Sequence, residues 1–563
     1  MNQLVIPEKL QELLRSEVRG TLAIDQALLD VGTPWGSWVR GTDHLSTVTS
    51  NATPLFDLPP LVAQFLGRSL EVQTVLQAIL QHRSLEILGS MGVGRSSLAR
   101  YLAHHPQVTT SHPDGLVYLQ EPFLISEVLQ ILFDRRFYTY PDTCPSPSQL
   151  QVALAEQKLL IFVDIPAWTS ADVQQLRQML PNSTLMVVAE QSCLDGETLV
   201  LSGLPPSDGI ALLETAIGRS IAAAERSQVE PLCQQVQGLP QALLYMATLV
   251  HEDGYSWSGL EDLLEGVTDG QIAIERLLEK VLEALGTPER WVLSLLLALD
   301  GVSLQAEQIA EMIGPRDPFP CLQRLQQRHL VKSSGKRYRL TRVVARRLRR
   351  NFTPDPWVVR ILTYLLPWVE VHRQFPDRLQ AELSLILFAI YAALDRRDWT
   401  AVLCLAQATE TSLILTKRWE SWGRVLQAAL QAAHHLGDQA AIATIWHQLG
   451  TRFLCQAEIP VAYDALSQAL KLRRQLGDEV GIAVTQQNLT YLMRDLLPKQ
   501  RQFSPPDRPA ILPFSRRRVY WVLGVLVVLT FVISFTGALW LQRSWQPWHE
   551  PDALESPTVK SGS

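Results

Sequence analysis

The chain has 563 residues, of which 47% are apolar and 19% are charged. Because a domain usually has about 150 residues, this length predicts several domains, and the apolar content excludes a largely disordered chain. The 50 Lys and Arg residues against 56 Asp and Glu residues give a net charge of −6, which excludes a protein that is basic throughout.

The six cysteines are widely separated, and none forms a CxxC pair or a cluster with histidine. This spacing argues against structural zinc and predicts reduced thiols in a cytosolic compartment. The first residues, MNQLVIPEKLQELL, lack a basic segment followed by an apolar one, so we expect no secretory signal. We assign no role to residues 1–60.

Residues 61–204 alternate short apolar runs with helical patterns, which predicts a parallel sheet built from strand–helix–strand units. Residues 205–286 contain helical patterns only. The strands expected in the first of these segments are Leu85–Leu88, Leu116–Leu119, Leu159–Val163 and Leu185–Val188.

The turn after the first expected strand has the sequence GSMGVGRSS and runs from Gly89 to Ser97. Glycines at a strand-to-helix turn let backbone N–H groups converge on a phosphate at the helix N-terminus. Gly89, Gly94 and Ser96 fit the GxxxxGK[ST] pattern, in which Ser96 would hold Mg²⁺. The lysine position holds Arg95, whose planar guanidinium does not replace a compact ammonium. A glycine-rich turn without any ligand is the alternative.

Four motifs in this order resemble the NB-ARC type of STAND signalling NTPases: Phe65-Leu66-Gly67-Arg68, the glycine-rich turn, the strand ending at Asp164, and Gly238-Leu239-Pro240. The resemblance covers residues 65–350 and implies a P-loop NTPase core, a helical lid and a winged helix. It also implies ATP or ADP with Mg²⁺ as the cofactor. The implied nucleotide-binding residues are Gly89, Gly92, Val93, Gly94, Arg95, Ser96, Ser97, Asp164, Arg68 and Pro240, and the implied metal ligands are Ser96 and Asp164.

Four phosphate-handling positions depart from the family pattern. Arg95 replaces the lysine, and Asp164 stands without a second acidic neighbour. Glu190 lies where the family has a phosphate-sensing arginine, and Thr341 lies where its winged helix has a histidine. Because phosphoryl transfer depends on positioning and charge stabilisation, these changes affect the chemistry itself. We expect nucleotide binding with little or no hydrolysis, and we assign no catalytic residue; a working ATPase is the alternative.

Residues 287–352 are predicted to form a three-helix unit with a two-stranded wing, as the resemblance also implies. Between Cys321 and Asn351 there are 11 Lys and Arg residues and no acidic residue. Such a segment could bind DNA phosphates with a helix in the major groove. It could instead pair with acidic residues of the lid, or contact anionic lipid headgroups. The sequence leaves all three interpretations open.

Residues 353–498 are helical and contain a repeat, in which Leu436-Gly437-Asp438 recurs as Leu476-Gly477-Asp478 after 40 residues. Their large and small residues resemble the longer form of the tetratricopeptide pattern. Such solenoids bind protein segments, so the expected partner is another protein, and a second copy of this chain is a further candidate. A generic helical bundle is the alternative. The residues that fit the pattern are Trp446, Leu449, Gly450, Phe453, Ala462, Leu466 and Ala469.

The last part of the chain predicts a membrane anchor. Residues 499–518 form a linker rich in proline and arginine, and residues 519–541 contain no charge. At about 1.5 Å per residue, a helix over this stretch is long enough to cross a bilayer. Three arginines precede it, so the positive-inside bias places the N-terminal bulk in the cytoplasm and residues 542–563 on the opposite side.

The fold class expected is therefore multidomain α/β plus α: a P-loop parallel-sheet core, a helical lid, a winged helix, a tetratricopeptide-like solenoid and one transmembrane helix. The leading hypothesis is a membrane-anchored STAND-like signalling or scaffold protein with a degenerate nucleotide module and protein-binding repeats. The alternatives are an active ATPase switch and a membrane-held transcription regulator that binds DNA through its basic winged helix.

Deletion of residues 516–563 is expected to convert the protein from membrane-bound to soluble, because the long uncharged stretch is then removed. Fractionation with a high-salt wash checks this, since salt strips chains that are held only by charge. A truncated chain that stays in the washed membrane pellet would contradict the prediction.

Overall fold

The computed structural model describes residues 49–50, 55–62, 65–120, 124–138, 147–165, 168–314, 317–456 and 458–493. The chain divides into two compact units, Met1–Leu497 and Pro498–Ser563, and the described residues all belong to the first. The predicted membrane span lies outside them. Within the described part of the chain, no helix is long and apolar enough to cross a bilayer.

A six-stranded sheet in which every pair is parallel confirms the predicted strand–helix–strand segment. The four predicted strands are all present. Two more were not predicted, because one has three residues and the other is mostly exposed. In spatial order the strands are β2 (Leu55–Asp57), β4 (Gly115–Leu119), β6 (Leu160–Val163), β7 (Thr184–Val188), β3 (Leu85–Gly89) and β8 (Glu197–Leu201).

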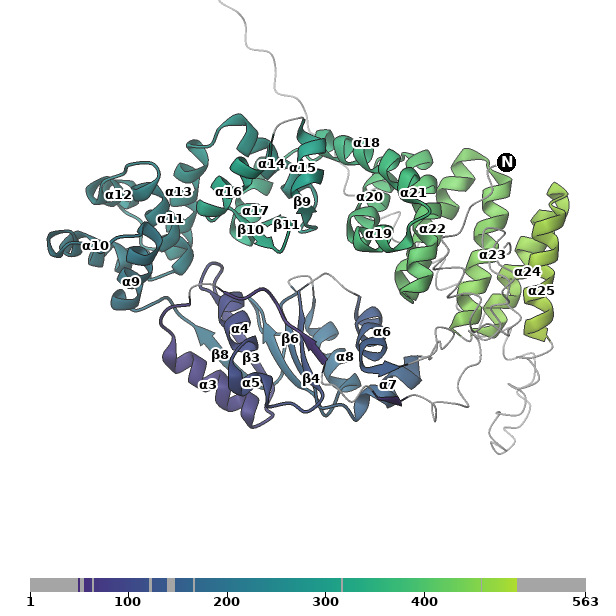
Figure 1. Cartoon of the computed structure of the whole chain (residues 1–563), viewed down its shortest axis with the longest axis horizontal. Coiled ribbons are helices and arrows are strands. Elements are labelled where there is room, and N and C mark those ends of the chain that lie inside the picture. The colour runs from purple at the N-terminus through teal and green to yellow at the C-terminus, as the bar shows by residue number, and fades with distance from the viewer. Residues whose placement is uncertain are drawn as a thin grey trace, which may run out of the picture. The chain divides into compact units, whose positions relative to one another are not determined.

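Helices cover both faces of this sheet (Figure 1). Alternate residues of β4 show the two faces: Leu116 and Tyr118 belong to one apolar core, and Val117 and Leu119 to the other. A short antiparallel pair, β1 (Thr49–Ser50) with β5 (Phe137–Tyr138), lies apart from the sheet. The first face is covered by α3 (Ser69–Leu80), α4 (Arg95–Ala103) and α5 (Pro106–Thr109), and the second by α6 (Ile125–Arg136), α7 (Pro147–Ala155) and α8 (Ser170–Met179).

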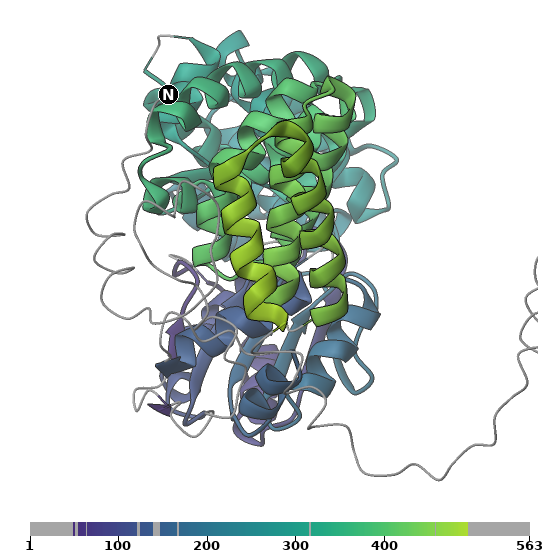
Figure 2. The same ribbon diagram turned by 90° about the vertical axis from the view of Figure 1, so that its right-hand side faces the viewer.

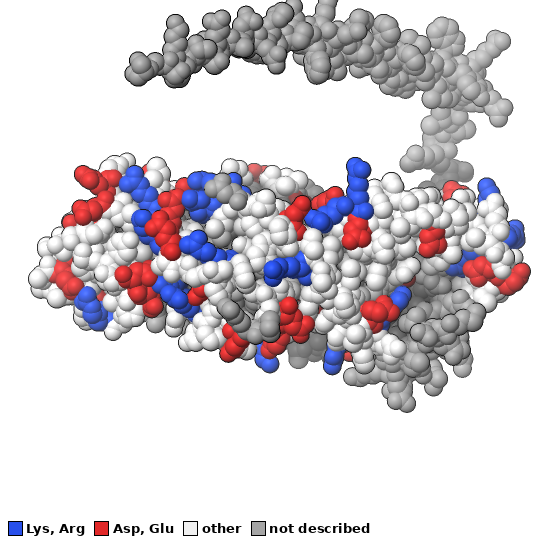
Figure 3. All heavy atoms as spheres, turned by 90° about the horizontal axis from the view of Figure 1, so that it is seen from above, with Lys and Arg blue, Asp and Glu red and all other residues white. Residues whose placement is uncertain are grey.

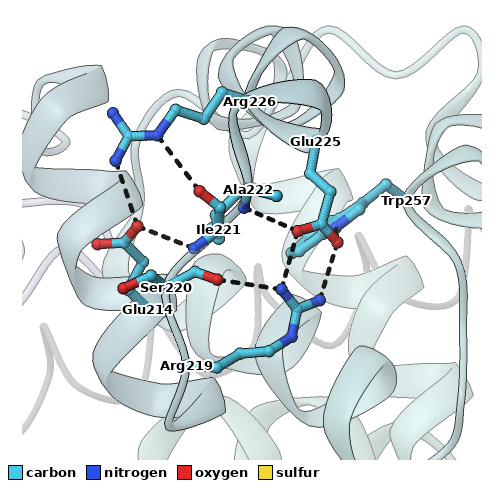
Figure 4. A network of polar contacts seen from close by, with 8 residues as sticks. All are labelled: Glu214, Arg219, Ser220, Ile221, Ala222, Glu225, Arg226 and Trp257. Atoms are coloured by element: carbon cyan, nitrogen blue, oxygen red, sulfur yellow. Dashed lines mark hydrogen bonds and ion pairs between the residues drawn. The ribbon is translucent and has the colours of Figure 1, made fainter.

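The lid segment, residues 205–286, contains only helices. Glu225 links two of them to the turn that holds Arg219, because its carboxylate accepts hydrogen bonds from both Nη atoms of Arg219 at 2.8 Å and from Nε1 of Trp257 at 3.1 Å (Figure 4). The hydrogen bonds from Arg219 lower the pKa of Glu225 to about 2. The helices are α9 (Pro206–Ile217), α10 (Ala223–Gln235), α11 (Pro240–His251), α12 (Trp257–Leu264) and α13 (Gly270–Glu283).

The winged-helix segment, residues 287–352, has the predicted three helices and hairpin. A two-residue strand, β9 (Leu304–Gln305), extends the hairpin to a three-stranded antiparallel sheet and was not predicted. The other elements are α14 (Thr287–Ala298), α15 (Ala306–Ile313), α16 (Phe319–Gln327), β10 (Val331–Ser334), β11 (Arg337–Leu340), α17 (Arg342–Leu348) and the 3₁₀ turn η3 (Arg349–Asn351).

Two helices, α18 (Asp355–His372) and α19 (Pro376–Ala381), lead to three helical hairpins, which we call the repeat array. Figure 2 shows the last of its helices side by side, in green to yellow. Asp398, Asp438 and Asp478 each accept a backbone N–H three residues on, so an N-cap recurs every 40 residues. The array comprises α20 (Leu383–Asp395), α21 (Trp399–Leu415), α22 (Trp419–Leu436), α23 (Gln439–Cys455), α24 (Ile459–Leu476) and α25 (Glu479–Tyr491).

Close contact between α23 and α24 explains the small residues of the predicted pattern. A Cβ atom on Gly450 would lie 2.6 Å from Cγ of Leu466, so only glycine fits there. Ala462, Leu466 and Ala469 are fully buried. Trp446 is only partly buried, whereas Trp422 of α22 is 1% exposed. The tryptophan that fills the array core is therefore one that the repeat pattern did not single out.

Trp422→Ala is expected to destabilise the array by about 3–5 kcal/mol, since it removes a large buried aromatic side chain. Trp446→Ala, the matched control, should cost less because that ring is partly exposed. Native-state hydrogen exchange of the α22 amides measures the local opening free energy. Equal effects of the two substitutions would contradict the prediction.

Candidate functional site

The glycine-rich turn forms an open helix N-terminus between β3 and α4. Gly92 and Gly94 have φ angles of 83° and 100°, which a side chain would strain. Gly94 occupies the N-cap of α4, and no side chain caps this helix. The first N–H groups of a helix have no acceptor within it, so the amides at the start of α4 are available to an anion.

The lid segment packs directly on this turn. A Cβ atom on Gly92 would lie 2.9 Å from both Cβ of Gln241 and Cδ1 of Ile274, which belong to α11 and α13. Gln241 donates its backbone N–H to the Gly92 carbonyl at 3.2 Å, and Nε2 of Gln271 donates to the Met91 carbonyl at 2.9 Å. The lid segment therefore fixes the turn by hydrogen bonds to the backbone carbonyl groups of the turn.

Arg68 and Pro240, which the resemblance implied as nucleotide-binding residues, both lie beside the turn. Arg68 is 6% exposed, and its Nη2 donates to the carbonyls of Val93 at 2.6 Å and Ser202 at 2.9 Å. Pro240 begins α11, and its Cγ would lie 3.9 Å from a Cβ on Gly94. Arg68 therefore braces the turn through its carbonyl groups.

Arg95 and Glu190 form an ion pair, with 3.0 Å between Nη2 and Oε1. Burial lowers the pKa of Arg95, and Glu190 acts in the opposite direction. Two of the four departures from the family pattern thus offset each other, because the charge of Glu190 is matched by that of Arg95. The guanidinium points its Nη2 at Glu190, while its buried Nη1 has no hydrogen-bond partner among the described residues.

The carboxylate of Asp164, at the end of β6, accepts hydrogen bonds from residues of three different elements. Ser96 Oγ of α4 donates to its Oδ1 at 3.1 Å, and Tyr118 Oη of β4 donates to its Oδ2 at 2.9 Å. Nη2 of Arg342, the first residue of α17, donates to Oδ1 at 2.9 Å and to the Asp164 carbonyl at 3.1 Å. The carboxylate is 3% exposed, so these bonds act in a largely desolvated place.

The winged-helix segment thus reaches the site through Arg342 rather than through Thr341. Thr341 is 4% exposed and donates its backbone N–H to the Leu330 carbonyl at 3.0 Å, so it holds the wing. The sequence placed Arg342 only among the 11 cations of the basic segment, so its bond to Asp164 was not predicted. Sequence reasoning also missed Tyr118, whose place in a buried strand gave no signal.

The residues present fit the phosphates of a nucleotide. The uncapped N-terminus of α4, the positive φ angles of Gly92 and Gly94, and the unpartnered Nη1 of Arg95 all suit an anion. The hydroxyl of Ser96 and the carboxylate of Asp164 are the oxygen donors that Mg²⁺ prefers. Among the described residues there is no cluster of three His, Cys, Asp or Glu side chains that could hold a metal ion instead. When bound, Mg²⁺ would neutralise phosphate charge there.

The basic segment between Cys321 and Asn351 is largely neutralised within the chain. Seven of its 11 cations form ion pairs, and on the face drawn in Figure 3 positive and negative side chains lie interspersed. This favours the interpretation as internal pairing over a free DNA-binding face. The pairs are Arg324–Glu289, Arg328–Asp253, Arg337–Glu382, Arg342–Asp164, Arg347–Glu279, Arg349–Asp300 and Arg350–Glu275.

No known family matches the sequence, and no curated protein matches it. Among solved structures, one similar chain is a STAND protein with a tetratricopeptide repeat sensor from Pyrococcus horikoshii, with 14% identity, 79% of each chain covered and a TM-score of 0.40. Another is a Walker-type ATPase of Pyrococcus abyssi, with 13% identity, 52% of this chain and 99% of that chain covered, and a TM-score of 0.24. At such low identities and TM-scores, neither similarity establishes a shared fold or function.

Proposed function

We propose that this protein is a STAND-like signalling or scaffold protein, of the NB-ARC type that its motifs resemble, in which a bound nucleotide controls how the winged-helix segment sits on the sheet. One observation carries the proposal. The carboxylate of Asp164 is bonded at once to Ser96 of the turn and to Arg342 of the winged-helix segment. Whatever binds at the turn therefore acts on the same side chain that holds the winged helix.

ATP or ADP is the nucleotide that the turn would take, with the amides from Gly92 to Ser97 around its phosphates. Mg²⁺ would compete with Arg342 for Asp164, because both are cations that need the same carboxylate oxygen. Binding of Mg²⁺–nucleotide would thus weaken the hold on the winged helix. The site offers no second carboxylate near Asp164 in sequence to activate water, which supports slow or absent hydrolysis.

The repeat array would carry the signal, through a direct contact with the sheet segment. Oε1 of Glu127, on α6, accepts the backbone N–H of Ser421 at 3.0 Å and so caps α22. Nζ of Lys417 lies 2.9 Å from Oδ1 of Asp134, and the lysine side chain is 8% exposed. A protein segment that binds the array can therefore alter α6, which covers one face of the sheet.

The uncharged stretch at 519–541 would anchor this switch to a membrane, with the described residues on the cytoplasmic side. The array would then recruit its protein partner, or a second copy of the chain, close to the bilayer. Contact of the remaining basic residues with anionic lipid would add to this anchoring.

A membrane-held transcription regulator remains a second candidate with less support. It would need the basic segment to face DNA phosphates, whereas the pairing of seven of its cations leaves few of them for counterion release. A salt-titrated gel shift with duplex DNA separates the two functions.

Calorimetric titration of the full chain is expected to show ADP and Mg²⁺–ATP binding that Gly94→Asp abolishes. Gly94 has a positive φ, and an aspartate would also place a negative charge at the phosphate position. Phosphate release by the unaltered protein should not exceed that of Gly94→Asp, and Arg95→Lys should not raise it. Steady turnover that Gly94→Asp removes would show that the protein is an ordinary ATPase.

Arg342→Gln is expected to loosen the winged-helix segment from the sheet, because it removes the charge bonded to Asp164. Hydrogen exchange in α17 should rise about tenfold, near the lower bound for a bond to a charged group. The control is Arg346→Gln on the same helix, since Arg346 is exposed and has no ion pair among the described residues. Equal exchange in the two variants would mean that the Arg342 bond does not hold the segment.

A further inference from the structure

Three cationic side chains near Asp164 form no ion pair with a carboxylate among the described residues. Arg100 of α4 and Arg339 of β11 both donate Nη2 to Oε1 of Gln120, at 3.2 and 3.4 Å. Lys332 of β10 is the direct cross-strand partner of Arg339 in the hairpin. Among the described residues, none of the three forms an ion pair with an acid. Two guanidinium groups therefore share a single neutral oxygen.

This arrangement is electrostatically unfavourable as it stands. The buried Nε of Arg100 has no hydrogen-bond partner among the described residues. Burial first, and then the charge of Arg100, lowers the pKa of Arg339. The pKa of Lys332 is lowered to about 8, first by desolvation and then by the charges of Arg100 and Arg339. Arg342 adds to the lowering and Asp164 opposes it. Much of the Lys332 side chain is nevertheless exposed. An anion would relieve these repulsions.

The cluster is continuous with the phosphate end of the glycine-rich turn. Ser96 and Arg100 are four residues apart on α4, so their side chains lie on the same face of the helix. Ser96 bonds Asp164, and Gln120 directly follows β4, the strand next to β6. In a parallel sheet the carboxyl ends of neighbouring strands meet at one edge. The cations therefore lie at the edge of the sheet where the turn also opens.

We propose that Arg100, Lys332 and Arg339 form a second anion site that binds a phosphate group. The group is either the terminal phosphate of a triphosphate held on the turn or free phosphate. Two of the three residues belong to the wing, so the site exists only while the winged-helix segment is docked. This inference rests on the proposed function and extends it: a terminal phosphate would strengthen docking, in opposition to the competition between Mg²⁺ and Arg342.

The test is calorimetric titration of the full chain with ADP, with a non-hydrolysable ATP analogue and with inorganic phosphate. The affinity for the analogue should be at least about tenfold higher than the affinity for ADP, because its terminal phosphate gains bonds to charged groups. The double substitution Lys332→Gln, Arg339→Gln should remove this difference and leave ADP affinity unchanged. Lys336→Gln on the same hairpin is the matched control and should behave like the unaltered protein. The charge-keeping pair Lys332→Arg, Arg339→Lys should retain most of the difference, which excludes a folding defect as the cause.

The three titrations distinguish a terminal phosphate from free phosphate, and they test the second anion site separately from the proposed function. Phosphate binding that the double substitution abolishes identifies free phosphate as a ligand, and an analogue preference without it identifies the terminal phosphate. If ADP binds but the unaltered protein shows neither analogue preference nor phosphate binding, the second site is overturned and the proposed function stands. If no nucleotide binds but phosphate binding depends on Lys332 and Arg339, the second site stands and the proposed function fails.

Discussion

The bonds to the carboxylate of Asp164 are the interaction on which the described structure depends. Asp164 ends a central strand, and Ser96, Tyr118 and Arg342 bring the glycine-rich helix, a neighbouring strand and the winged-helix segment to it. A nearly buried carboxylate needs such partners, because an unpaired charge there would be costly. The ion pair between Arg342 and Asp164 therefore restricts where the winged-helix segment can lie. A cation that competes with Arg342 for the carboxylate would remove this restriction.

The distribution of positive charge sets this site apart from the pattern it resembles. The turn's own cation, Arg95, is matched by Glu190, so the loop contributes little net charge to a phosphate beyond its backbone amides. The uncompensated cations come instead from α4 and from the wing. Since the wing is a separate part of the chain, charge at the site depends on whether that part is docked. In the proposed switch, phosphate binding and the position of the winged-helix segment would then be coupled through the same side chains.

In the proposed switch, the contact between α6 and the array would connect this coupling to a protein partner. Glu127 and Asp134 both lie on α6, and each is engaged by the array next to the start of α22. Lys417 precedes α22 with a positive φ of 52°, a strained conformation for a residue other than glycine. A ligand on the array can shift this junction only if it binds the docked and undocked arrangements with different affinity.

The sequence by itself determined the parallel sheet, the helical character of the lid and the array, and the open helix N-terminus, because each follows from local periodicity, glycine placement or a cap that recurs every 40 residues. The resemblance of its motifs also implied that Arg68 and Pro240 bind the nucleotide, and the structure places both beside the turn. Only the tertiary structure decided which charges meet. The pairing of Arg95 with Glu190, the reach of Arg342 to Asp164 and the sharing of Gln120 by two arginines join residues far apart in the chain. Local pattern holds no information on such partners, since they are fixed by how strands, lid and wing pack together.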